Sequence, residues 1–297
     1  MKTLSKATLG ASILAASSSA FATGFFYDVG VAGSAGTGFD ANTLTGVAQQ
    51  FAFSANTESV QFDDDGNPGL TVGDSFVDSG NAYINGLIAS AIIDDEGLDS
   101  LGGYELTATW TGLSGTVTAF DGVNQTTTYD SGTVISFYLD TALNRNDNGS
   151  LGLGDDTGYG DGTKVLELTI LGGTGSNLFS GGAFVSGSSI IFGEITFALE
   201  DFFFFDSNGD GIADTSADSD ANDLLDGGII ALSWNLDQNT DNVVVGPGDP
   251  LNSELFTVLS DHNGSIDFTV AVPEPGTLAL MGLGLLGMGG LARRRVR

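Results

Sequence analysis

The chain has 297 residues, no cysteine and a formal net charge of −30, from 38 Asp and Glu against eight Lys and Arg. This excess of negative charge repels nucleic acid and anionic lipid headgroups, so a nucleic-acid-binding protein is excluded. Hydrophobic residues make up 41% of the chain, including 20 Phe, which favours a folded core over an acidic disordered chain. Without cysteine the fold has no disulfide framework.

The first 22 residues have the three parts of a secretory signal. Lys2 and Lys6 supply the positive charge, residues 7–16 form an apolar run, and Ala20-Phe21-Ala22 provides a small-residue cleavage site. A buried N-terminal helix is the alternative, which the small residues at the end of the segment disfavour. We therefore expect residues 1–22 to be removed when the protein is exported.

The body, residues 23–271, is predicted to be all-β. Apolar and polar residues alternate with the period of two that is typical of half-buried strands. The 45 Gly of the chain disfavour helices, and Gly, Asn, Asp and Ser clusters separate the alternating segments. The sequence thus predicts an antiparallel β-sandwich or jelly roll with long acidic loops. The predicted strands are 47–53, 104–110, 133–139, 164–170, 189–199, 229–236, 255–259 and 265–272.

Four consecutive phenylalanines, residues 202–205, have two interpretations. They could form an exposed patch that stacks on sugars or adheres to a surface. A buried strand end beside a loop is the alternative, and we favour it because apolar runs of this length are usually buried.

The last 26 residues, 272–297, contain three consecutive parts. A Pro-Glu-Pro peptide disfavours helix and stays extended and accessible. Residues 277–292 carry no charge, and as a helix they would measure about 24 Å, short of the roughly 30 Å hydrocarbon core. The arginines that follow are expected to stay on the cytoplasmic side of this marginal transmembrane helix. The residues of the motif and of the cluster are Pro273, Glu274, Pro275, Arg293, Arg294 and Arg295.

This tail resembles the PEP-CTERM sorting signal of Gram-negative bacteria, in which a Pro-Glu-Pro motif, a Gly/Leu-rich hydrophobic segment and an Arg cluster follow one another. The resemblance implies that an exosortase and the secretion machinery are partners, and that Pro273, Glu274 and Pro275 are recognition residues. It also implies transient anchoring in the inner membrane, followed by delivery to the cell surface or the exopolysaccharide matrix. A permanent tail anchor is the alternative.

The body itself resembles the flocculation-associated PEP-CTERM proteins over residues 40–275. The similarity consists of VGDSFVDSG, YELTATWTGLSG, SFYLD, KVLELTILGG followed by GGAF, and FTVLSDHNGSIDFTVAVPEP. Proteins of this group bind cells and exopolysaccharide into flocs. The resemblance therefore implies a surface or extracellular-matrix protein that associates with exopolysaccharide and promotes flocculation or biofilm cohesion.

The acidic segment 206–226 predicts a Ca²⁺ site. DSNGDGIAD matches the D-x-[DN]-x-[DN]-G opening of a calcium loop, in which side-chain oxygens at alternate residues converge on one hard cation. A second copy follows twelve residues later, although Ala217 and Asp223 replace the expected Glu and Gly, so the pair resembles thrombospondin type 3 loops more than an EF-hand. A solvated acidic turn without an ion is the alternative. The predicted ligands are Asp206, Asn208, Asp210, Asp214, Asp218, Asp220, Asn222 and Asp226.

Two other segments repeat this spacing less completely. In 63–74, Asp63, Asp65, Asn67 and Asp74 hold ligand positions, but Pro68 replaces the turn glycine. Segment 144–155 has the same spacing but fewer charged residues. The residues at the ligand positions and the turn are Asn144, Asn146, Asn148, Gly149 and Asp155.

Catalytic patterns are sparse, and we predict that the protein is not an enzyme. The single histidine, His262, lies in Asp-His-Asn-Gly at 261–264, which predicts a turn between two strands, and no G-x-S-x-G elbow is present. Two alternatives stay open: a lectin-like carbohydrate-binding module with Tyr83, Tyr129 or Tyr159 stacking on sugars, and a secreted polysaccharide hydrolase with paired carboxylates.

Overall fold

A computed structural model describes most of the body of the chain. The described residues all fall in one compact unit, Phe21–Val270. In this part of the chain no helix combines the length and the apolar character needed to cross a bilayer. The predicted signal, the strand at 229–236 and the tail lie outside the described residues. The described residues are 24–30, 43–67, 69–90, 94–146, 153, 156–180, 183–213, 215, 218–220, 237–238, 243–246 and 254–268.

The named elements of this part are all strands, and every pairing between them is antiparallel, which confirms the all-β prediction. The strands are β1 (Phe25–Tyr27), β2 (Gln50–Phe62), β3 (Ser75–Ile88), β4 (Glu105–Phe120), β5 (Asn124–Tyr129), β6 (Val134–Asp140), β7 (Thr163–Ser180), β8 (Ala183–Ala198), β9 (Phe203–Phe205), β10 (Ser219–Asp220), β11 (Asp237–Gln238), β12 (Val243–Val245) and β13 (Glu254–Asp267).

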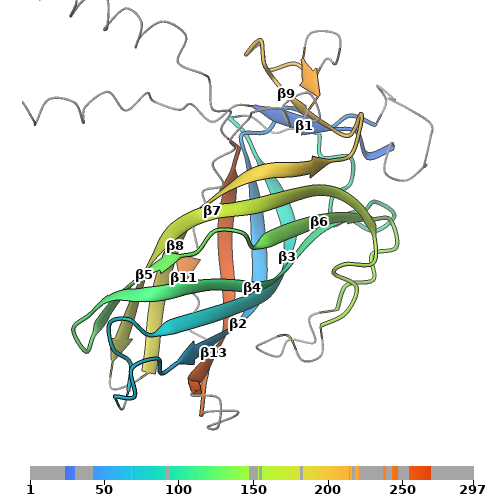
Figure 1. Ribbon diagram of the computed structural model, residues 1–297. Helices are drawn as coiled ribbons and strands as arrows, with labels where there is room; N and C mark the ends of the chain where they lie inside the picture. Colours follow the sequence, from blue (N-terminus) through green and yellow to red (C-terminus); the bar gives the residue numbers. More distant parts are fainter. Residues whose placement is uncertain are drawn as a thin grey trace, which may run out of the picture. The chain divides into compact units, whose positions relative to one another are not determined.

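Two sheets of unequal size make up the fold. The large sheet has ten strands in the order β11-β13-β2-β3-β4-β5-β7-β6, with β12 beside β13 and β8 beside β7. Register shifts in six of its strand pairs, such as those at Ala52/Phe53 and Asp78/Gly80, bend the strands. As a result the sheet curls, and β8 comes close to β11 and β12 (Figure 1). The small sheet contains β1, β9 and β10.

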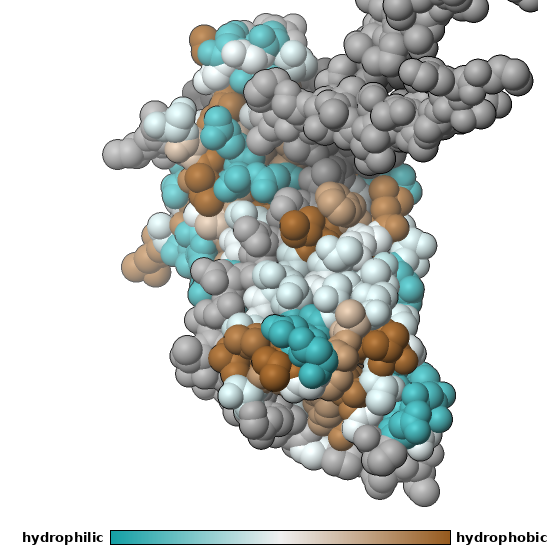
Figure 2. All heavy atoms as spheres, turned by 90° about the vertical axis from the view of Figure 1, so that its left-hand side faces the viewer, coloured by the Kyte–Doolittle hydropathy of each residue, from teal (hydrophilic) through white to brown (hydrophobic). Residues whose placement is uncertain are grey.

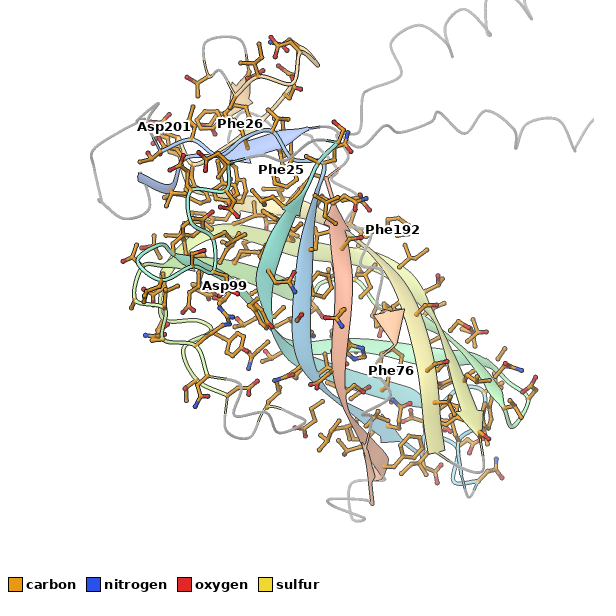
Figure 3. The ribbon with its side chains drawn as sticks, turned by 180° about the vertical axis from the view of Figure 1, so that it is seen from behind. Phe25, Phe26, Phe76, Asp99, Phe192 and Asp201 are labelled. Atoms are coloured by element: carbon orange, nitrogen blue, oxygen red, sulfur yellow. The ribbon has the colours of Figure 1, made fainter. Side chains whose placement is uncertain are left out.

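The inner face of the large sheet changes character along its strands. On β2, Phe51, Phe53 and Ala55 are buried in the hydrophobic core, whereas Thr57 and Gln61 are buried polar residues at the same period of two. We call the part around Phe51 the apolar half and the part around Gln61 the polar half. In Figure 3, Phe25 lies near one end of the strands and Phe76 toward the other.

The small sheet covers the apolar half with aromatic rings. Phe25 contacts Phe51 and Phe268, each at a centroid distance of 4.7 Å, and Phe203 lies 6.2 Å from Phe51. Residues 202–205 are all buried, and the last three form β9, which confirms the buried interpretation of the phenylalanine run. Burying these rings provides much of the hydrophobic stabilisation of this end.

The prediction of a turn at 261–264 is wrong. These residues lie inside β13, where His262 pairs with Ala55 of β2 and with Gln238 of β11. Turn-prone residues are accommodated here because their side chains find partners on β2: the Ser54 hydroxyl donates to Asn263 Oδ1 at 2.7 Å, and Thr57 Oγ1 bonds His262 Nε2 at 2.8 Å. The two predicted strands on either side are thus one strand.

On the face shown in Figure 2, exposed hydrophobic side chains do not form one continuous patch, and hydrophobic patches alternate with hydrophilic ones. Leu178, Val185, Ile190 and Phe192 are examples of partly exposed hydrophobic side chains on β7 and β8. Scattered exposure of this kind is ordinary for a folded domain.

Candidate functional site

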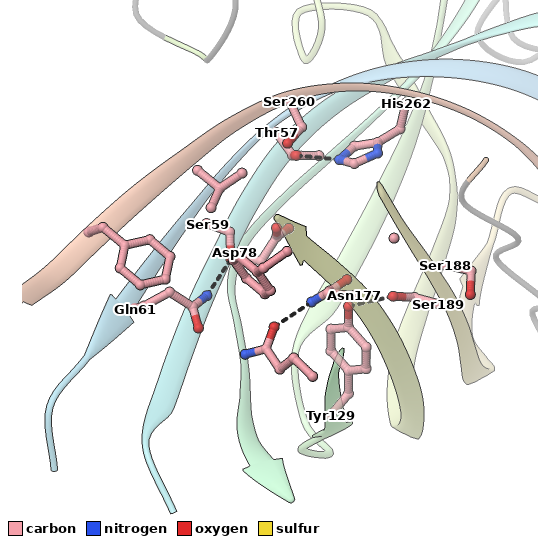
Figure 4. Close-up of a pocket in the computed structure, with 15 residues that line it drawn as sticks. Thr57, Ser59, Gln61, Asp78, Tyr129, Asn177, Ser188, Ser189, Ser260 and His262 are labelled. Carbon is pink, nitrogen blue, oxygen red and sulfur yellow. Dashed lines mark hydrogen bonds between the residues drawn. The ribbon is translucent and has the colours of Figure 1, made fainter. Parts of the chain in front are cut away.

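A cavity of about 60 Å³ lies in the polar half. At about 30 Å³ per water molecule, this volume corresponds to roughly two water molecules. Six strands contribute to its wall, and Figure 4 shows their polar side chains directed toward a common space. The lining residues are Thr57, Ser59, Gln61, Asp78, Gln125, Tyr129, Asn177, Phe179, Gly187, Ser188, Ser189, Phe256, Val258, Ser260 and His262.

The cavity has a simple origin in the sequence. On β2 the inward positions Phe51, Phe53 and Ala55 are followed by Thr57, Ser59 and Gln61, so the alternation continues while the side chains become polar. The sequence prediction ended this strand at Phe53, because it relied on apolar residues alone to mark the inner face. The uninterrupted period of two through Gln61 was the signal that could have revealed both the full strand and the cavity.

Asp78 occupies the cavity wall at a bulge in β3. The register shifts between Asp78 and Gly80, and the Trp110 indole Nε1 donates to Asp78 Oδ1 at 2.7 Å. A Cβ at position 80 would overlap the Trp110 ring, so the absent side chain lets the indole pack against the strand and reach the carboxyl group. Burial raises the pKa of Asp78 to about 7, although the indole hydrogen bond acts in the opposite direction.

The other titratable groups of the cavity are neutral at pH 7. Burial lowers the pKa of His262 to about 4, so its imidazole carries no charge. Burial and the nearby Asp78 carboxylate raise the pKa of Tyr129 above its ordinary value, and its hydroxyl bonds Ser189 Oγ at 2.8 Å. The cavity therefore presents amides, hydroxyls and aromatic rings with little net charge.

Two buried glutamines each keep one polar atom without a partner. Gln61, 7% exposed, donates from Nε2 to Ser59 Oγ at 3.2 Å, while its Oε1 has no hydrogen-bond partner. Gln125, 1% exposed, accepts from Asn177 Nδ2 at 2.7 Å, while its Nε2 has none. Exchanging O and N in Gln61 alone, or in Gln125 and Asn177 together, still leaves one such atom in each glutamine. Both glutamines line the cavity, and a small rotation of either side chain would turn its unused acceptor or donor toward a guest.

The three tyrosines proposed for sugar stacking have different environments. Tyr159 is 5% exposed, and the guanidinium of Arg145 lies 3.9 Å from the centroid of the Tyr83 ring. Tyr129 lines the cavity and packs edge-on against Phe76 at 5.2 Å. Of the three, Tyr129 has the most direct access to a guest in the cavity.

The first predicted calcium loop folds around Asp206, which is 9% exposed. Its carboxylate accepts from the backbone N–H groups of Gly209, Asp210 and Gly211 at 2.7, 3.1 and 3.0 Å. Asn208 and Asp210 are exposed and close further turns with their own side chains. The loop is thus bent around the single carboxylate of Asp206, and the convergence of several side-chain oxygens that the motif predicts stays a prediction.

The second copy of the motif is arranged differently. Asp220 belongs to β10, and its Oδ2 accepts from the Asp201 backbone N–H at 2.9 Å, on the chain segment before β9. Asp218 lies just before β10. The remaining predicted ligands Asp214, Asn222 and Asp226 lie outside the described residues.

The segment 63–74, between β2 and β3, brings together three carboxylates. Single oxygen atoms of Asp63, Asp65 and Asp74 lie within 4.8 Å of one another, and Asp74 is fully buried. Asp74 Oδ2 accepts from the Thr71 backbone N–H at 2.6 Å, and Oδ1 accepts from the Asp64 N–H at 3.2 Å. Oxygen ligands in this arrangement suit a hard cation such as Ca²⁺.

The segment 144–155 shows no comparable grouping in its described residues. Asn144 Nδ2 donates to Asp161 Oδ2 at 3.1 Å, and Asn146 bridges to Thr157 through the backbone. Asn148, Gly149 and Asp155 lie outside the described part.

The comparisons with known proteins bear on the tail. The family described as the PEP-CTERM protein-sorting motif matches residues 271–295. The chain carries a PEP-CTERM sorting motif. The motif implies an exported protein that is held transiently at a membrane and processed by an exosortase. Comparisons with curated proteins and with solved structures gave no match.

The matched segment includes Pro273, Glu274 and Pro275 and the arginines 293–295, all of which lie outside the described residues. The motif therefore identifies how the protein is exported and processed. The cavity and the acidic loops of the body bear on what the protein does after export.

Proposed function

We propose that this PEP-CTERM protein is a non-enzymatic component of the cell surface or extracellular matrix of a Gram-negative bacterium. In this role it associates with exopolysaccharide and promotes flocculation or biofilm cohesion. The observation that carries the proposal is the sorting motif at 271–295 on an exported all-β body. In that body 37 acidic residues accompany just two cationic ones, Arg145 and Lys164.

A non-enzymatic role is supported by the composition of the cavity. Glycoside hydrolysis generally requires two carboxyl groups on opposite sides of the scissile bond. Among the described residues that line the cavity, Asp78 is the one carboxylic acid. His262, which could serve as a base, bonds Thr57 and has a lowered pKa because it is buried. These groups suit binding better than hydrolysis.

Ca²⁺ is proposed as a structural ligand of the acidic loops. The grouped oxygens of Asp63, Asp65 and Asp74 support one site, and the turn built around Asp206 supports a second. A bound cation would offset the repulsion between these carboxylates and hold the loops in one conformation. Exposed carboxylates could share such cations with an acidic polysaccharide, which would link the protein to its matrix.

A lectin-like role is the second candidate. The observation in its favour is the cavity, whose neutral polar lining and aromatic side chains have the chemistry of a sugar-binding site.

The test of the exported-matrix role uses variants of the tail in the native host. The triple variant Pro273→Ala, Glu274→Ala, Pro275→Ala and a deletion of 272–297 are compared with the matched control Thr277→Ser. We expect the control to be cut and recovered from the matrix, the triple variant to accumulate uncut in the membrane fraction, and both tail variants to reduce clumping. Full-length, uncut wild-type protein in the soluble cytosolic fraction would contradict the proposal.

A further inference from the structure

We propose that the cavity of the polar half binds one neutral sugar residue, held between the side chains of Gln61, Gln125 and Tyr129. The proposal rests on the matrix role given above and deepens it, since it assigns a ligand class and a site to the association with polysaccharide. It follows from three properties of the cavity: its unpartnered polar atoms, its charge and its aromatic walls.

The unpartnered atoms indicate what the guest must supply. Burying a polar atom without a hydrogen bond is costly, and native proteins retain few such atoms. Here Gln61 Oε1 and Gln125 Nε2 are both unpartnered and buried, and both residues line the same cavity. An acceptor and a donor on one cavity match a guest that donates at one point and accepts at another. A sugar carries several hydroxyl groups, each of which can do both.

The charge of the residues that line the cavity determines whether neutral, acidic or basic hydroxylated ligands bind best. No Lys or Arg is present among the described residues of the wall, so a uronate or phosphate group would find no cation to pair with. A cationic guest would have one carboxyl partner, Asp78, which also receives the Trp110 indole N–H. Amides and hydroxyls dominate the remaining wall, with Asn177 and Ser189 as examples. Neutral sugars are therefore favoured over acidic or basic ones.

Aromatic side chains provide the apolar part of the wall. Tyr129 is fixed by its hydrogen bond to Ser189 and by its edge-on contact with Phe76. Phe179 and Phe256 also line the cavity, with ring centroids 6.4 Å apart. The C–H face of a pyranose ring packs on such rings while its hydroxyls reach the amides, which is the combination expected of a small-ligand site. A cavity of about 60 Å³ is smaller than a whole pyranose ring, so it admits one edge of a single residue, such as a chain end, and excludes a run of sugars.

The test is a titration of the exported, processed protein with methyl glycosides of glucose, galactose, mannose and N-acetylglucosamine, followed by calorimetry. Glucuronic acid and glucosamine serve as charged comparisons. We expect at least one neutral glycoside to bind with a millimolar or lower Kd, and both charged sugars to bind more weakly.

Two variants connect binding to the unpartnered atoms. Gln61→Met and Gln125→Met preserve the shape of the side chain but remove its amide, and each should weaken binding by about tenfold, the effect of one lost buried hydrogen bond. Each variant removes an unpartnered buried atom but also the hydrogen bond to Ser59 or Asn177, so we expect its melting temperature to fall only slightly, and binding is measured well below it. The matched controls are Thr126→Val and Glu58→Gln, which lie on the outward positions of β5 and β2 and should bind like the wild type.

Three results would overturn the proposal. They are the absence of binding by all four neutral glycosides, equal or tighter binding of a charged sugar, and unchanged binding in both glutamine variants. The outcome is separable from that of the tail experiment. If no glycoside binds but the protein is still cut and found in the matrix, the site assignment alone fails. If sugars bind but the protein stays in the cytosol, the matrix role fails.

Discussion

The apolar and polar halves of the interior are built from the same strands but serve different purposes. On β2, three inward positions from Phe51 to Ala55 belong to the core, and the next three, from Thr57 to Gln61, line a cavity. The backbone pairing with β3 and β13 continues through both. Strand pairing alone therefore does not define a core. On one face of the same strand, the side chains at each position determine whether that stretch packs into the core or lines a cavity.

The two halves also differ in how their side chains are satisfied. The aromatic rings of the apolar half contact one another in edge-on pairs, such as Phe25 with Phe51 at 4.7 Å. The polar half keeps two amide atoms without partners and a carboxyl group whose pKa is raised to about 7. Local departures of this kind from the rules of stable packing are characteristic of functional sites.

The largest expected effect comes from removing a ring in the apolar half. Phe51 is fully buried and contacts Phe25 and Phe268. Phe51→Ala should lower the free energy of unfolding by about 3–5 kcal/mol, through lost transfer energy and the cavity left behind. Ser59→Ala, on the same face of β2 in the polar half, should cost about 1 kcal/mol or less. Urea denaturation of both variants measures the difference. Equal losses would show that the two halves do not differ in this way.

Calcium is expected to act on the loops at both ends. Segment 63–74 follows β2, next to the polar half, and Asp206 follows β9, next to the apolar half. If both loops bind, Ca²⁺ at about a hundred times its Kd should raise the free energy of unfolding by about 3 kcal/mol per site. Asp63→Asn should abolish the part of the gain in melting temperature that comes from segment 63–74. Asp206→Asn should abolish the part that comes from the loop at Asp206.

Asp121→Asn is the matched control for the calcium experiment. Asp121 is exposed and accepts from the backbone N–H groups of Val123 and Asn124, so it has similar turn geometry without neighbouring carboxylates. This variant should retain the full response. A melting curve of the wild type that does not change in millimolar Ca²⁺ would remove the cofactor proposal altogether.

The smallest net effect in the wild type concerns pH and the polar half alone, because two titrating groups there oppose each other. The pKa of Asp78 is raised from 3.8 to about 7, so its contribution to stability is present at low pH and is lost as the pH rises toward 7. The pKa of His262 is lowered from 6.5 to about 4, so its contribution is present above 6.5 and is lost as the pH falls toward 4. Between these limits the two contributions to the free energy of unfolding oppose each other, each by at most about 1.4 kcal/mol per pH unit.

Single variants separate the two contributions. Relative to the wild type, Asp78→Asn should gain stability as the pH rises from 4 to 6.5, and His262→Gln should lose it. The double variant should restore a profile with the slope of the wild type. Urea denaturation across this range provides the measurement, and parallel profiles for both single variants would contradict the assigned pKa shifts.

The sequence was informative where a pattern had one physical meaning. Alternation with clusters of Gly and Asn led to an antiparallel all-β fold, and the Pro-Glu-Pro, hydrophobic and Arg segments led to the sorting motif. The prediction was wrong where pairing with distant strands overrides the local preference of the residues for a turn. Asp-His-Asn-Gly at 261–264 forms part of a long strand because β2 and β11 pair with it on both sides.

The candidate site was the least predictable part. Its residues come from six strands, and their convergence depends on the curl of the sheet, which no local spacing encodes. The acidic loops were partly predictable: Asp63, Asp65 and Asp74 have calcium-loop spacing and do come together, although the proline at position 68 argued against the motif. Polar residues at the strand period, such as Thr57 and Gln61, mark the part of the inner face that lines the cavity.

A crystal structure of the exported protein soaked with the methyl glycoside that binds best tests the central claim most directly. We predict one sugar ring in the polar half, with hydroxyl oxygens about 2.6–3.2 Å from Gln61 Oε1 and Gln125 Nε2 and a ring face against Tyr129. A cavity that contains only ordered water in the soaked crystal, with the sugar absent or bound elsewhere, would contradict it.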